Sequence, residues 1–98
     1  MKEKKIIREE LRSIRHYYSF VKGKCVGESI IPNDIELLVA KYNEAVKSAP
    51  IKLYEVYCCL YIEGNTIESL ADKWGYTVQT VSVRNRLLVD FLQKKLVD

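Results

Sequence analysis

The sequence has little of what a membrane or secreted protein needs. No apolar run approaches the roughly 18 to 20 residues that are required to span a bilayer. The amino-terminal residues lead into a charged amphipathic stretch, where a signal peptide would need an apolar core. We therefore expect a cytoplasmic protein with no membrane partner.

Residues with metal-binding or redox chemistry are equally scarce. The three cysteines, Cys25, Cys58 and Cys59, form no even disulfide framework, and an adjacent pair cannot supply the C-x2-C spacing of a zinc site. His16 is the only histidine, with no other ligand at suitable spacing. We expect no metal, a reducing compartment, and Cys58 and Cys59 buried as small hydrophobic residues.

The usual marks of an enzyme are also missing. The sequence has no glycine-rich phosphate loop, no serine nucleophile elbow and no paired carboxylates in a plausible cleft. We therefore expect neither catalysis nor a cofactor.

The chain does have the composition of one helical unit. With 98 residues, of which 48% are hydrophobic and 30% charged, it can bury a single modest core. Apolar residues recur at spacings of three and four, and the β-branched pairs are interrupted by helix formers. The sequence predicts an all-α fold of about five helices.

The first two predicted helices are separated by a segment without helical periodicity. One helix covers residues 3–21 within an N-terminal segment at 1–22, and residues 23–33 form a connection. The second helix begins at Asn33 or Asp34 and ends near position 47. The expected inward-facing residues are Ile7, Leu11, Ile14, Tyr18 and Val21 in the first helix, and Ile35, Leu38, Val39, Tyr42 and Val46 in the second.

Three further helices are predicted in a helical domain at residues 34–98. A proline in the first turn and a glycine at the end bound the third, over residues 50–64. Thr66 caps a fourth helix over residues 69–74, Gly75 ends it, and Thr77 caps the fifth. The fifth helix is expected to face inward through Val81, Leu88, Phe91 and Leu92.

The last two predicted helices meet the requirements of a DNA-reading helix-turn-helix, at residues 66–97. Such a motif joins two helices by a tight turn, with small and apolar residues where they touch. Ala71 is small at the crossing, and Gly75 can take the positive φ that ends the first helix. Arg84 departs from the pattern, because a generic bihelical unit buries an aliphatic residue there. The residues expected to close the angle are Leu70, Trp74 and Val81.

A longer pattern surrounds this motif. Its residues are Glu55, Val56, Glu63, Gly64, Leu70, Ala71, Gly75, Thr77, Thr80, Val81 and Arg84. In order and spacing they resemble region 4 of bacterial sigma factors, in which an arginine at the place of Arg84 is common. Further matches precede them at Lys41, Tyr42, Asn43, Glu44, Ala45, Ala49, Pro50, Leu53 and Tyr54. With these, the whole chain is similar to the small sigma-like regulators of phages and prophages, of the RinA and ArpU type.

The resemblance implies a DNA-binding transcription regulator that activates phage late genes together with RNA polymerase. The sequence has no counterpart of sigma region 2, so we do not expect it to open a promoter alone.

The exposed face of the last helix is the predicted DNA-binding surface. Gln79 can pair bidentately with adenine, and Val78 or Val83 can touch a thymine methyl group. Arg86 can reach guanine or a phosphate, and hydroxyls near the helix start suit phosphate oxygens. The predicted site residues are Thr77, Val78, Gln79, Thr80, Ser82, Val83, Arg84 and Arg86.

Positive charge gathers on the last helix and on the first. The first helix carries Lys2, Lys4, Lys5, Arg8, Arg12 and Arg15, partly offset by Glu3, Glu9 and Glu10. We expect double-stranded DNA as the partner, and the basic helix can contact DNA backbone, RNA polymerase or a second copy in a homodimer. Its apolar stripe can pack on its own domain or pair with another chain.

A different class of function stays open. A protein-interaction adaptor would bind RNA polymerase or another regulator without touching DNA, and the acidic stretch at residues 50–76 permits this.

Overall fold

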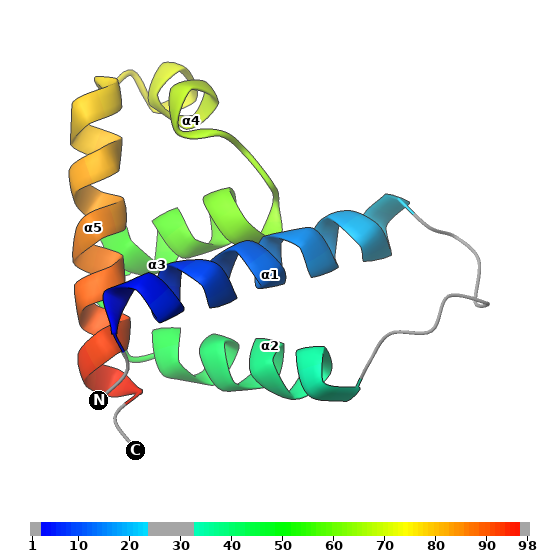
Figure 1. Ribbon diagram of the computed structural model, residues 1–98. Helices are drawn as coiled ribbons and strands as arrows, with labels where there is room; N and C mark the ends of the chain where they lie inside the picture. The colour runs from blue at the N-terminus through cyan, green and yellow to red at the C-terminus, as the bar shows by residue number, and fades with distance from the viewer. Residues whose placement is uncertain (1–2, 24–32, 97–98) are drawn as a thin grey trace.

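The computed structural model of the chain describes residues 3–23 and 33–96, and every regular element in these ranges is a helix. The elements in chain order are α1 (Lys4–Gly23), α2 (Asn33–Val46), α3 (Ile51–Tyr57), the π-helix η1 (Cys58–Ile62), α4 (Ile67–Trp74) and α5 (Val78–Lys95) (Figure 1). The expected all-α class with about five helices is confirmed. Most of the connection expected at residues 23–33, and Cys25 within it, lies outside the described residues. None of the described helices is long and apolar enough to cross a membrane.

Helix α5 stands along one side of the molecule and contacts all four other α-helices of the described residues, α1, α2, α3 and α4 (Figure 1). α1 crosses the front of the molecule between α2 and the α3–η1 segment, while α4 lies at the opposite end of α5 from α2. The α4–α5 pair therefore forms a corner that projects from the rest of the bundle.

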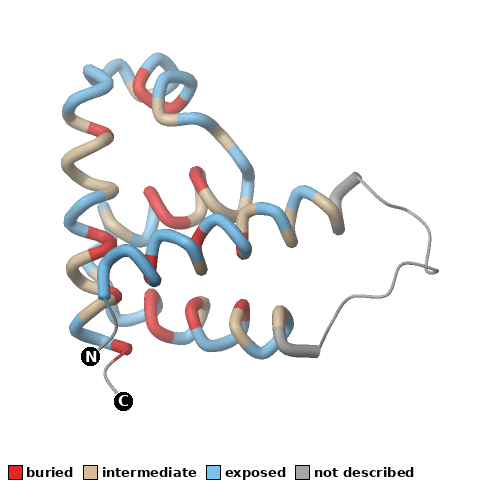
Figure 2. The backbone as a smooth tube through the Cα atoms, in the orientation of Figure 1, coloured by how far each residue is buried: buried red, intermediate tan, exposed pale blue. Residues whose placement is uncertain are grey.

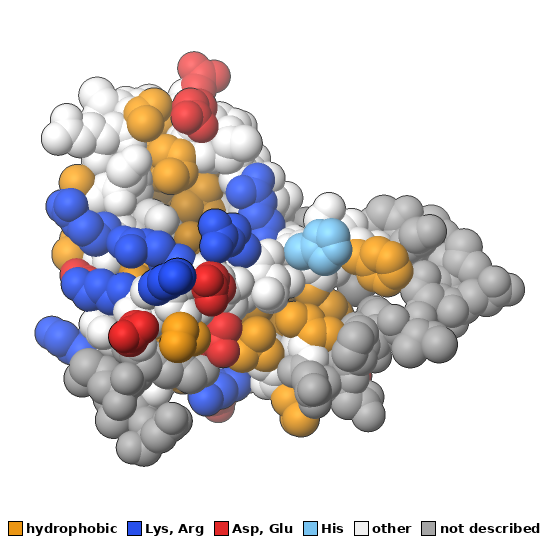
Figure 3. Space-filling model, in the orientation of Figure 1, with side chains coloured by type: hydrophobic (Ala, Val, Ile, Leu, Met, Phe, Trp, Pro, Cys, Tyr) orange, Lys and Arg blue, Asp and Glu red, His pale blue; other side chains and the backbone are white. Residues whose placement is uncertain are grey.

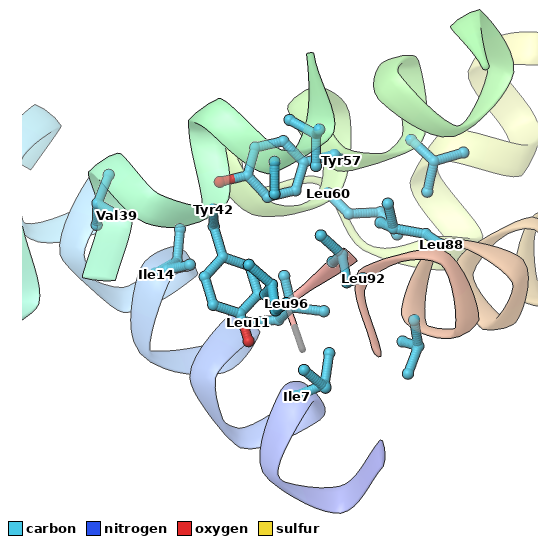
Figure 4. Close-up of a cluster of buried hydrophobic side chains, with 14 of the residues drawn as sticks. Ile7, Leu11, Ile14, Val39, Tyr42, Tyr57, Leu60, Leu88, Leu92 and Leu96 are labelled. Carbon is cyan, nitrogen blue, oxygen red and sulfur yellow. The ribbon is translucent and has the colours of Figure 1, made fainter. Parts of the chain in front are cut away.

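The first helix is an integral part of the core. Figure 2 shows buried positions along α1, and Ile7, Leu11 and Ile14 are at most 1% exposed. Ile7 and Leu11 lie among core residues of α5 and α2 (Figure 4). Burying side chains of this size contributes about 1.5–3 kcal/mol each. The apolar stripe of α1 thus packs on its own chain, which is the first of the two arrangements that the sequence allows. The side chain of Val21 is outside the described residues.

The inward face of α5 is wider than the sequence pattern indicates. Val81, Leu88 and Leu92 are fully buried as expected, and Phe91 is half-buried. Val89 is also fully buried, although the periodicity did not select it. Because α5 contacts α1 and α2 in addition to α3, more than one stripe of its surface is covered.

The third helix changes its winding after Tyr57. The expected single helix is instead α3 followed by η1, in which the Glu63 N–H donates to the Cys58 carbonyl at 2.9 Å, five residues back. Gly64, with φ of 81°, then ends the helix as expected. Cys58 and Cys59 lie in η1 and are half-buried rather than buried, and both are packed against the core. Burial still raises the pKa of both thiols.

Tyrosine hydroxyls join the helices at the edge of the core. Tyr42 of α2 donates to Glu10 Oε1 of α1 at 2.6 Å. Tyr57 of α3 donates to Asn43 Oδ1 of α2 at 2.6 Å. Tyr61 of η1 in turn donates to Asn85 Oδ1 of α5, also at 2.6 Å. The rings supply apolar area while each hydroxyl has a partner on another helix.

Candidate nucleic-acid interface

Local hydrogen bonds define both ends of α4. The Ser69 N–H donates to Thr66 Oγ1 at 3.0 Å, so Thr66 is the N-cap, and the helix begins at Ile67. The expected start at Ser69 was two residues late, because the first turn after a cap is already helical. At the other end Gly75 has φ of 73°, and the Tyr76 N–H donates to the Ala71 carbonyl at 2.8 Å. This bond and that from Gly75 N–H to Asp72 form a Schellman motif, which stops the helix sharply.

The turn into α5 is short and is fixed by Thr77. Its Oγ1 accepts the Thr80 N–H at 3.1 Å, which makes Thr77 the N-cap that the sequence predicts. The hydroxyls of Thr77 and Thr80 also lie 2.9 Å apart and share a hydrogen bond. Thr77 and Thr80, two of the three hydroxyl residues expected to donate to phosphate together with Ser82, thus have a structural role in starting the helix, and Thr80 is half-buried.

The two helices touch through small and apolar side chains. Leu70 and Val81 are fully buried, Ala71 is 3% exposed, and Trp74 is partly buried against the core. A methyl group at position 71 lets the backbones of α4 and α5 approach. The short turn and this contact hold α5 at a fixed angle to α4, with its first turns at the corner of the molecule (Figure 1).

The predicted contact residues divide into two groups by exposure. The exposed group consists of Thr77, Val78, Gln79 and Arg86, and 45% of the surface of Val78 is accessible to solvent. Ser82 and Val83 were expected on the open face but are half-buried, and the predicted contact residues Thr80 and Arg84 are half-buried as well. Ser82 directly follows the buried Val81, and Val83 lines a groove beside the helix.

Arg84 makes a contact that the spacing of apolar residues in the sequence does not predict. Its guanidinium carbon lies 4.6 Å from the centre of the Tyr76 ring, and Tyr76 meets Trp74 edge to face. A cation over an aromatic face contributes about 0.5–1 kcal/mol at a partly exposed site. Arg84 therefore covers the turn before α5 by stacking on Tyr76. An aliphatic residue at this position would cover the turn by being buried against it.

An open groove of about 890 Å³ runs beside α5. One wall is the start of α3, and the other is α5 itself. Leu87 lies in this groove and is 48% exposed, although the sequence pattern did not predict it as a surface residue of interest. The two walls are more than 20 positions apart in the chain, so only the fold brings them together. The apolar lining residues are Pro50, Leu53, Val83, Leu87 and Phe91, and the basic ones are Lys52, Arg84 and Lys94.

Comparison with known proteins gives no relative. No family model, curated protein or solved structure matches the chain. The similarity to sigma region 4 thus stays a prediction from the residue pattern. Within the described residues, no three side chains of His, Cys, Asp or Glu are grouped to hold a metal ion. The α4–α5 corner presents exposed side chains of three kinds on α5: the amide of Gln79, the apolar Val78 and the guanidinium of Arg86.

Proposed function

We propose that the chain binds double-stranded DNA in a sequence-specific manner and regulates transcription, with α5 in the major groove. The observation that carries the proposal is the fixed corner between α4 and α5. A capped three-residue turn holds the two helices, while the first turns of α5 point Val78 and Gln79 away from the core. Such a geometry lets a second helix enter a groove while the first supports it.

Each exposed side chain on α5 has a task in this proposal. Gln79 pairs with adenine N6 and N7, and Val78 contacts a thymine methyl group. Arg86 lies two turns further along the same exposed side and reaches guanine or a phosphate. Arg84 keeps its contact with Tyr76 and acts on the position of the turn.

The resemblance to sigma region 4 and to phage or prophage regulators supports a setting for this activity. One helix-turn-helix buries about 600–1,000 Å² on DNA, which rarely gives tight specific binding alone. We propose that contact with RNA polymerase adds the second attachment at promoters. A homodimer would have to form through surfaces other than the apolar stripe of α1, since that stripe is buried within the chain.

The groove beside α5 favours a second candidate function. Its exposed Leu87 and its neighbours Leu53 and Phe91 form an apolar strip that a protein partner can cover. In that case the chain would act as an adaptor for RNA polymerase or another regulator, without DNA contact.

Selection from a random duplex library, followed by gel shifts on the enriched sequence, tests the proposal. We expect enrichment of a short motif and a loss of about one and a half to three orders of magnitude in affinity between 50 and 200 mM salt, as three to six phosphate contacts require. Gln79→Ala should relax the base preference while a Leu87→Ala control keeps it. No enriched motif together with no salt-dependent binding would exclude DNA binding and favour the adaptor.

A further inference from the structure

The basic residues of α1 lie on one side of the helix. At 3.6 residues per turn they fall within about 100° around the axis, next to the buried stripe. Glu10 lies on the other side, where Tyr42 of α2 donates to it. We call this side the basic edge, and its members are Lys4, Lys5, Arg8, Arg12 and Arg15.

Two contacts turn the basic edge toward the helix-turn-helix. Lys4 Nζ lies 2.8 Å from Asp90 Oδ1 of α5. Eleven residues later, Arg15 Nη2 donates to the Gly64 carbonyl at 3.0 Å, just before α4. The basic edge therefore spans from α5 to the segment that leads into α4, and Figure 3 shows Lys and Arg side chains in a band across α5 and α1.

Arg8 and Arg12 lie between these two anchor points, and both are exposed. Among the described residues neither takes part in an ion pair. Arg8 and Arg15 also act on Tyr61 of η1: burial raises the pKa of Tyr61, and the hydrogen bond with Asn85 and the charges of Arg15 and Arg8 oppose that rise. Tyr61 itself is bonded to Asn85 of α5. Two unpaired guanidinium groups thus flank the helix that is proposed to read DNA.

Charges on α5 reinforce this side of the molecule. Its one acidic residue, Asp90, is paired with Lys4, and the ion pair with Lys4 together with nearby Lys94 and Arg86 holds the pKa of the carboxyl below its usual range. α4 carries Glu68 and Asp72, and Figure 3 shows acidic side chains at the α4 end of the molecule as well as beside the basic residues of α1. A polyanion next to α5 would thus follow the basic edge of α1, where five basic residues lie together.

We propose that the basic edge of α1 binds the phosphate backbone of the DNA whose major groove α5 enters, with Arg8 and Arg12 as the main contacts. This inference rests on the proposed function. The edge is about 16 Å long at 1.5 Å per residue, which matches four to five base-pair steps of about 3.4 Å. Guanidinium groups suit phosphate because their parallel N–H groups can engage two oxygens.

The test compares two double variants with equal loss of charge. R8A/R12A removes the proposed contacts, and K41A/K47A removes two exposed lysines as the control, Lys41 in α2 and Lys47 directly after it. Binding is measured by fluorescence anisotropy against a selected duplex and a random duplex, at 50 to 200 mM salt. Circular dichroism checks that both variants keep the helical fold.

R8A/R12A should weaken binding to both duplexes by roughly 10- to 60-fold at 100 mM salt and reduce the salt slope by about two, with base preference unchanged. If R8A/R12A matches the control while Gln79→Ala still alters base preference, only this inference fails. If the parent chain binds neither duplex, the proposed function fails and takes this inference with it. Binding to RNA polymerase is measured for the same variants. If R8A/R12A loses this binding while the salt slope of its DNA binding is unchanged, the edge belongs to a protein partner and the proposal is overturned.

Discussion

Arg15 and Gly64, separated by 49 positions, are joined by a hydrogen bond of 3.0 Å from Nη2 to the backbone carbonyl. The bond connects the N-terminal helix to the point where the chain leaves η1 and turns toward α4. Gly64 has a left-handed backbone there, and Thr66 begins the next helix two residues later. The position of the α4–α5 pair thus depends on α1 through a polar contact as well as through the core.

The structure predicts that adjacent residues of α1 differ strongly in their effect on stability. Ile7 is fully buried, whereas Ile6 is 40% exposed. Ile7→Ala should lower the free energy of unfolding by about 2–5 kcal/mol, because it leaves a cavity. Ile6→Ala should cost less than about 1 kcal/mol. Urea unfolding followed by circular dichroism measures both, and equal effects would mean that α1 does not pack in this register.

Gly75→Ala should destabilise the protein through the backbone alone. A Cβ at this position meets nothing within 4 Å, so the cost comes only from φ of 73°. That conformation costs an L-residue about 1–2 kcal/mol. Gly75→Asn should cost less, since asparagine enters the left-handed region more readily. Thermal melts that rank alanine above asparagine in stability would contradict the observed helix end.

Ala71→Leu should separate α4 from α5. Ala71 is 3% exposed at their contact, and three added carbons have no space there. Overpacking of this kind typically costs about 1–3 kcal/mol. Asp72→Leu places the same side chain at the next, exposed position and should change stability by about 0.5 kcal/mol or less. A thermal melt in which the Ala71→Leu variant equals the parent would show that the helices do not cross here.

Stability should fall as the pH rises above about 10. Burial raises the pKa of Tyr57, and burial with the hydrogen bond to Glu10 raises that of Tyr42. The unfolded chain releases these protons near pH 10 while the folded chain keeps them. The contribution that the two protonated tyrosines make to stability is therefore fully present below pH 10. Above pH 10 the free energy of unfolding decreases by up to about 1.4 kcal/mol per pH unit for each tyrosine.

Urea midpoints between pH 8 and 11.5 measure this decrease. Tyr57→Phe should make the decline shallower, even though it lowers stability at pH 8 by leaving Asn43 Oδ1 without its donor. Tyr76→Phe, at an exposed position, serves as the control and should keep the slope of the parent. A slope that Tyr57→Phe leaves unchanged would place the alkaline transition on other groups.

Features that depend on neighbouring residues could be read from the sequence. The Thr66 and Thr77 caps, the glycine end of α4 and the buried stripe of α1 all follow from local hydrogen bonding or from helical spacing. The crossing at Ala71 followed from the small side chain between two capped helices.

Features made by distant segments could not be read in this way. The spacing of α5 alone cannot show that Val89 is covered or that Leu87 opens into a groove, because α1, α2 and α3 decide both. The stacking of Arg84 on Tyr76 and the pairing of Lys4 with Asp90 need a three-dimensional arrangement. The basic edge was visible as a cluster, but not the side of the molecule on which it lies.

The bond between Tyr61 and Asn85 has a consequence for the thermodynamics of recognition. It fixes the rotation of α5 about its own axis, and the hydroxyls of Tyr57 and Tyr42 continue the same restraint into α2 and α1. A helix that is free to rotate would lose conformational entropy on entering a groove. In the proposed complex that loss has already occurred during folding, so DNA bound to α5 would meet a preorganised surface and more of the contact energy would remain as affinity.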